Sequence, residues 1–122
     1  MKVNENIVPS TIEKAVELIV NSLEPQDIEI ILKAQNSYGC HFGIGRYFRN
    51  SWSLWENDSP LKRDAVRTYK IAHADDISGL ILEWVFCKVK NISFNPQEYV
   101  ERFHKHWAQY GMTSLKAGNW ED

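Results

Sequence analysis

Residues 73–89 of the chain read HADDISGLILEWVFCKV, and this stretch decides the fold. The apolar residues that it contributes to a helix are Ile77, Leu80, Ile81, Trp84, Val85 and Val89. They fall on nearly every side of that helix, which is typical of a helix that other elements cover. Asp75 or Asp76 can cap its first turn, because a side-chain oxygen there accepts a hydrogen bond from an unpaired backbone N–H. The sequence therefore predicts a central core helix that begins at this aspartate pair.

Two helical patterns precede the core helix near the N-terminus. Ser10 and Glu13 have the spacing of a capping box, and apolar residues then recur at helical period as far as Leu23. Pro25 ends this first amphipathic helix. Residues 26–35 are rich in isoleucine, and we favour a helix there over the alternative, a strand.

Two further helix starts are marked by a capping residue followed by proline. Ser59 and Pro60 predict a helix that extends to about Lys70. Asn95–Pro96 repeats the pattern and predicts a final amphipathic helix, which Gly111 can close.

Strong caps and the lack of hairpin signals predict an all-α fold. We expect a single compact domain of about five or six helices over residues 1–122, monomeric or weakly dimeric. Its ordered core should span about residues 10–111, and residues 112–122 should form a flexible tail.

Composition and charge exclude several classes of function. The chain has 122 residues and a net charge of -2, whereas a general nucleic-acid binder needs a basic surplus to release counterions from phosphates. We therefore predict no nucleic-acid partner. No apolar run approaches a membrane span, and residues 1–14 lack the apolar core of a secretory signal, which predicts a cytoplasmic protein without a membrane partner. Cys40 and Cys87 are then reduced thiols.

The densest run of polar and aromatic side chains is CHFGIGRYFRNSWSLW, residues 40–55. On a helix, His41, Gly45 and Arg49 lie four residues apart on one face, so the imidazole and the guanidinium flank a glycine notch. The notch can cradle an anion or a partner's backbone. It can also admit a crossing helix while Arg49 pairs with an aspartate, and we favour this structural interpretation.

The same run contains further residues that we predict for a binding surface. They are Arg46, Asn50, Trp52 and Trp55. Indole rings beside arginines have the composition of an interaction hot spot, although tryptophans are more often packed in the core. Both roles remain open for the two tryptophans.

A second polar group, HADDIS, contains His73, Asp75, Asp76 and Ser78 at the start of the core helix. Carboxylates are favoured at a helix N-terminus by the helix dipole and the unpaired amides, so capping explains at least one aspartate. The other can meet Arg46 or Arg49 across the fold and orient it. The simplest arrangement joins both motifs in one polar cluster, which either binds a ligand or partner or only specifies the fold.

Neither motif completes a catalytic or metal-binding signature. The chain has no HExxH pair and no GxSxG turn, and Gly43 and Gly45 lack the third glycine of a dinucleotide-binding loop. His104 and His106 lie two residues apart on a predicted helix and should point in different directions. We therefore predict no catalytic residue, no metal and no cofactor.

The order HFGIGRYFRNSWSLW, SPL and HADDISGLIL resembles a family of small bacterial proteins catalogued as a domain of unknown function. That family's pattern, HxGxGxxxRNxxxLW followed by HPDDxSxxIL, corresponds to roughly residues 12–89, with Ala74 where the family often has proline. The positions that the pattern marks are His41, Gly43, Gly45, Arg49, Asn50, Leu54, Trp55, His73, Asp75, Asp76 and Ser78. The resemblance implies a shared fold and no particular activity.

These observations favour a noncatalytic cytosolic protein-binding domain, of the kind that serves as an immunity or antitoxin protein and neutralises a bacterial toxin. The alternative is an enzyme or small-ligand binder that uses the His/Arg/Asp cluster on an anionic ligand. A third interpretation is a helical domain whose polar cluster only stabilises the fold.

Overall fold

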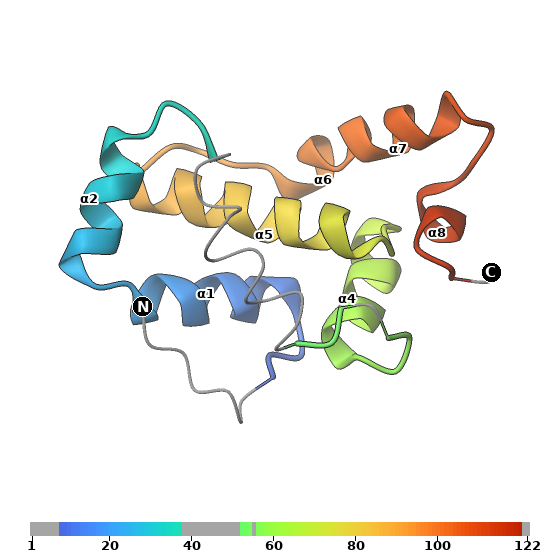
Figure 1. The fold of residues 1–122 in the computed structure, drawn as a ribbon, viewed down its shortest axis with the longest axis horizontal. Coiled ribbons are helices and arrows are strands. Elements are labelled where there is room, and N and C mark those ends of the chain that lie inside the picture. Colours follow the sequence, from blue (N-terminus) through green and yellow to red (C-terminus); the bar gives the residue numbers. More distant parts are fainter. Residues whose placement is uncertain (1–7, 38–51, 55, 121–122) are drawn as a thin grey trace.

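The helix at the centre of the fold is α5 (Ala74–Val89), which runs through the middle of the molecule with other helices on both sides (Figure 1). The computed structural model describes residues 8–37, 52–54 and 56–120. Eleven of the sixteen residues in α5 are buried, and Trp84 is partly buried at the edge of the core. The predicted central core helix is therefore confirmed.

Four of the described helices make the more extensive backbone contacts with α5. They are α1 (Ile12–Ser22), α2 (Pro25–Lys33), α4 (Pro60–Tyr69) and α6 (Pro96–Tyr99). The isoleucine-rich segment is thus the helix that we favoured over a strand. Ser59 caps α4 as predicted, and its hydroxyl also donates to the backbone carbonyl of Trp52 at 3.0 Å.

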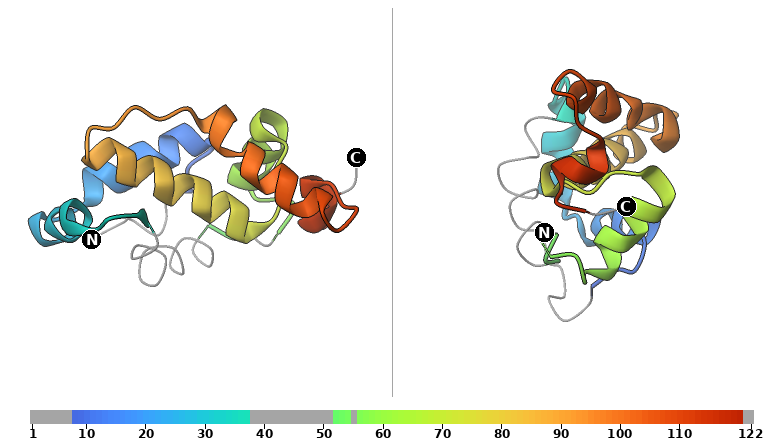
Figure 2. Two further views of the ribbon diagram at one scale, coloured as in Figure 1. Left: turned by 90° about the horizontal axis from the view of Figure 1, so that it is seen from above. Right: turned by 90° about the vertical axis from the view of Figure 1, so that its right-hand side faces the viewer.

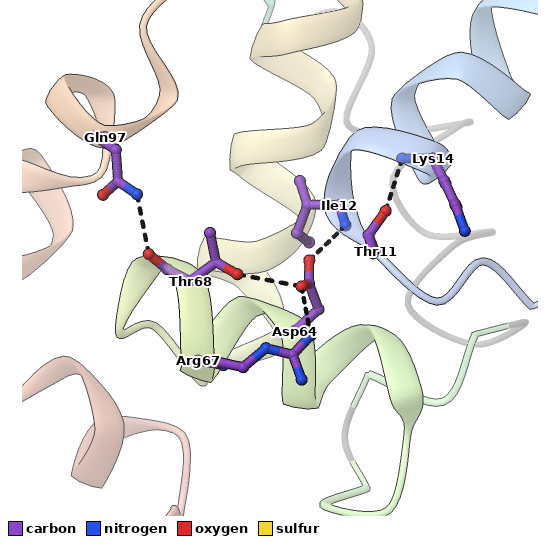
Figure 3. Close-up of polar contacts among 7 residues, drawn as sticks. All are labelled: Thr11, Ile12, Lys14, Asp64, Arg67, Thr68 and Gln97. Atoms are coloured by element: carbon purple, nitrogen blue, oxygen red, sulfur yellow. Dashed lines mark hydrogen bonds and ion pairs between the residues drawn. The ribbon is translucent and has the colours of Figure 1, made fainter.

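Helix α1 packs along α5 through four buried apolar residues: Ile12, Ala15, Val16 and Ile19. Its N-cap is Thr11, whose side chain accepts a hydrogen bond from the Lys14 backbone N–H, so the predicted capping box at Ser10 is wrong. The reason lies in α4, where the Asp64 carboxylate accepts from the Ile12 backbone N–H at 2.8 Å (Figure 3). A partner 52 residues away thus satisfies part of the first turn.

Asp64 is 6% exposed and links several elements through both of its oxygens. One oxygen accepts from Ile12, and the other accepts from the side chains of Arg67 and Thr68 within α4 (Figure 3). The Gln97 amide of α6 donates to the backbone carbonyl of Thr68 at 3.0 Å. A continuous polar chain therefore connects α6, α4 and α1.

The C-terminal part contains α6, α7 (Glu101–Ala108) and α8 (Ser114–Ala117). Asn95 caps α6 as predicted, and Gly111 adopts a positive φ of 69° in the turn after α7. The sequence predicted a flexible tail from residue 112, but α8 is helical there, with Ser114 2% exposed. The Nζ of Lys62, itself 2% exposed, donates to the Gly118 carbonyl at 3.0 Å. Contacts with α4 therefore hold this segment.

Across the part of the chain that the structure describes there are seven helical segments and no strand. Only Val100 separates α6 from α7, so the two form one bent helix, and the predicted all-α domain of about six helices is confirmed. None of the described helices combines the length and the apolarity needed to cross a membrane.

Candidate functional site

Five of the predicted site residues belong to the described part of the chain: Trp52, His73, Asp75, Asp76 and Ser78. The other five, His41, Arg46, Arg49, Asn50 and Trp55, lie outside the described residues, as do Cys40, Gly43 and Gly45. The meeting of the two polar motifs in one cluster stays a prediction.

His73 is the N-cap of α5. Its backbone is extended, and its Nδ1 accepts a hydrogen bond from the Asp75 backbone N–H at 3.1 Å. The predicted cap at Asp75 or Asp76 is therefore wrong. Both aspartates lie inside the first turn, where the helix dipole still favours their charges.

Asp76 connects the core helix to α7. Its side chain is largely buried, and its Oδ2 accepts from the Trp107 indole N–H at 2.8 Å. The His73 ring stacks on the same indole, with the ring centroids 5.5 Å apart. Burial raises the pKa of the Asp76 carboxyl, and the hydrogen bond from Trp107 offsets part of that rise. Asp76 and His73 therefore attach α7 to the core helix.

Ser78 and Trp52 are core residues. Ser78 is 0% exposed, and its hydroxyl donates to the backbone carbonyl of Asp75 at 3.1 Å. Trp52 is 1% exposed, which corresponds to the packing role that the sequence left open. Neither side chain is available to a partner at the surface.

A cleft of about 390 Å³ lies between α5, the residues that follow α2 and the α6–α7 segment. The residues that line it are Asn36, Ser37, Asp75, Asp76, Gly79, Glu83, Tyr99, Arg102 and Phe103. We call this the acidic cleft, because its described lining carries three carboxylates and one guanidinium. The described part of the lining has an excess of negative charge, which attracts cationic groups.

Side-chain contacts fix both walls of the acidic cleft. On the α5 wall, the Ser37 hydroxyl donates to Glu83 Oε2 at 2.5 Å. On the opposite wall, the guanidinium of Arg102 lies over the Tyr99 ring, 4.0 Å from its centroid. The cleft therefore offers carboxylates on one side, whereas on the other side Arg102 covers the Tyr99 ring.

Sequence reasoning missed the residues that complete this site. Tyr99, Phe103 and Trp107 form an apolar stripe on the amphipathic helix predicted after Asn95–Pro96, and they lie outside the polar motif that the sequence indicated. Their spacing of four residues was the available signal, because that stripe has to face another element. The pairing of Trp107 with Asp76, 31 residues earlier, has no local signature.

Other titratable side chains do not extend the site. His104 Nδ1 lies 2.7 Å from Ser114 Oγ, whereas His106 packs against Trp107 and Tyr110, so the two histidines diverge as predicted. Burial raises the pKa of the Cys87 thiol, which favours an inert thiol. Within residues 8–37, 52–54 and 56–120, no group of three or more histidine, cysteine or acidic side chains is placed to hold a metal ion.

In comparisons with known proteins, the first two thirds of the chain match a family. No curated protein and no solved structure matches the chain. Residues 8–88, which run from the segment before α1 almost to the end of α5, match a sequence family. His73, Asp75 and Asp76 lie inside the matched region, whereas the α6–α8 segment lies beyond it. Because the match covers more than half of the chain, the protein belongs to the family described as Domain of unknown function (DUF6794).

Proposed function

We propose that this protein is a noncatalytic protein-binding domain whose acidic cleft receives a positively charged part of its partner. The observation that carries the proposal is the composition of that cleft. Asp75 and Glu83 line one wall, and the Tyr99 ring with Arg102 above it lines the other. The α5 carboxylates suit the lysine and arginine side chains of a partner, whereas the Tyr99 ring is already covered by the chain's own guanidinium.

More specifically, we propose that this domain is a cytosolic immunity or antitoxin protein. A small acidic domain can neutralise a toxin by covering a positively charged surface that the toxin needs for its activity. The net charge of -2 and the acidic cleft both support such a role. The bacterial toxin is then the partner, and the chain acts as a monomer or weak dimer.

Capture of the partner from the native host tests the proposal. The tagged chain and its Asp75→Asn/Glu83→Gln variant are used in parallel, and bound proteins are identified by mass spectrometry. The variant keeps hydrogen-bonding side chains but removes two charges from the cleft. We expect it to retain severalfold less of the partner at low salt, because charges at an interface mainly set the association rate.

A matched variant, Glu13→Gln/Glu17→Gln, removes two exposed carboxylates from α1. It should capture as much partner as the unchanged chain. Equal capture by the cleft variant, or a loss with the α1 variant, would contradict the assignment of the interface to the acidic cleft.

The second candidate function is binding of a small anionic ligand, with or without catalysis. Its His/Arg/Asp cluster needs His41 and Arg49, which lie outside the described residues. The described lining of the cleft contains more carboxylates than guanidinium groups, which favours a cationic ligand. A rise of the melting temperature with added inorganic phosphate would support the anionic candidate over our proposal.

A further inference from the structure

Both ends of helix α7 are anchored to the rest of the molecule. None of its residues is buried, although it is amphipathic. At its N-terminal end Val100 is 1% exposed, and at its C-terminal end α8 is held by the Lys62–Gly118 hydrogen bond. Figures 1 and 2 show α7 beside one end of α5, on the side away from α1.

Near its C-terminal end α7 is joined to α5 by the polar and ring contacts of Trp107, and in its middle Phe103 packs, partly buried, against the core. Trp107 donates to the largely buried carboxylate of Asp76 and stacks on His73. A hydrogen bond to a charged acceptor is strong when it is made and costly to leave unmade. Any group that replaces Trp107 must therefore bring its own donor to Asp76.

Hollow spaces border α7 on two sides. The acidic cleft separates part of α7 from α5, and a second cavity of about 370 Å³ lies between α7 and α8. The turn between these helices contains Gly111 in the left-handed region, and its neighbours Tyr110 and Met112 are exposed. Few buried contacts and an exposed turn are properties of segments that open locally.

We propose that α7 is a displaceable strap, which in the unbound protein covers the surface of α5 on which the partner docks. This surface comprises Asp76, Gly79 and Glu83, and it belongs to the matched family region, whereas the strap does not. The partner replaces the Trp107 indole with an N–H donor of its own, from a lysine or arginine side chain, which fits the negative lining. The inference rests on the proposed protein-binding function.

Hydrogen exchange of the full-length chain, followed by mass spectrometry, tests the strap without a partner. Amides of α7 should exchange through local opening, far faster than those of α5. Trp107→Phe keeps an aromatic ring but removes the donor to Asp76, so α7 should open roughly tenfold to hundredfold more often while α1 and α5 stay protected. Trp120→Phe, the same change beyond α8, should leave exchange of α7 unaltered. Equal protection of α7 and α5 in the unchanged chain would overturn the strap.

Partner capture then tests what the strap covers. Trp107→Phe should retain more of the partner that the unchanged chain retains, because less free energy is spent on displacing α7. Unchanged or lower capture, with faster exchange of α7, would overturn the competition between strap and partner. If no partner is found at all, the proposed function fails, and the exchange experiment still decides whether α7 opens.

Discussion

Helices α1 and α7 are both amphipathic, yet they are joined to the rest of the molecule in different ways. Four side chains of α1 are buried, and these pack along α5. No side chain of α7 is buried; its contacts with the core are the Trp107–Asp76 hydrogen bond and the partly buried ring of Phe103. Apolar packing stabilises in proportion to the area removed from water, whereas a hydrogen bond contributes little net free energy. An amphipathic pattern thus predicts a helix but not how firmly it is held.

The largest expected effect concerns the apolar interface of α1. Ile19 is 0% exposed and belongs to the core cluster, so Ile19→Ala should lower the free energy of unfolding by about 2–5 kcal/mol. Phe103→Ala, at a partly buried position of α7, should cost clearly less although it removes a larger side chain. Urea denaturation measures both. Similar costs would show that α7 is packed as firmly as α1.

The next effect concerns the polar link between α4 and α1. Asp64→Ala leaves the buried Ile12 backbone N–H without its acceptor and should cost about 1–3 kcal/mol. Asp64→Asn keeps one carbonyl oxygen and should restore part of that loss. The midpoint of urea unfolding reports both variants, and an unchanged midpoint for Asp64→Ala would show that another group or water replaces the carboxylate.

The helices were predictable from the sequence wherever the signal is local. Ser59–Pro60 and Asn95–Pro96 place a capping oxygen next to a proline, and the helices begin there. The cap of α1 was missed because Asp64, on another helix, supplies an acceptor to its first turn. His73 was missed as a cap because asparagine, aspartate, serine and threonine are the residues that the cap position usually selects.

The candidate site was predictable only in part. The composition of HADDIS predicted a polar group that either binds a partner or specifies the fold. In the structure, His73 and Ser78 of this group make local hydrogen bonds. The pairing of Asp76 with Trp107 depends on how α7 folds back over α5, which periodicity does not encode. Short α8 was read as a tail because four residues carry too little pattern to predict a helix.

A smaller effect is expected where α8 docks. A Cβ at Gly118 would lie 2.1 Å from the backbone carbon of Ala72, so Gly118→Ala should push the segment away from the backbone that precedes α5. Global stability should fall by roughly 1 kcal/mol or less, because the C-terminal segment can move without opening the core. Cleavage by chymotrypsin at exposed Tyr110 should become faster. Unchanged cleavage would show that α7 does not depend on the docking of α8.

The smallest expected effect is a pH dependence of the unfolding free energy, which arises from the Asp76 carboxyl. Burial raises the pKa of its carboxyl in the folded state, so the folded protein binds this proton more tightly than the unfolded chain does. Stability from this group is therefore fully present below the unfolded pKa and is lost as pH rises through the folded pKa.

Asp76→Asn keeps an oxygen acceptor for Trp107 and removes the titration. The unfolding free energy of the variant minus that of the unchanged chain should rise with pH across this window, as measured by urea denaturation at a series of pH values. A difference that falls with pH would show that the carboxylate is better stabilised in the folded protein than in water, and that α7 is held more strongly than its contacts indicate.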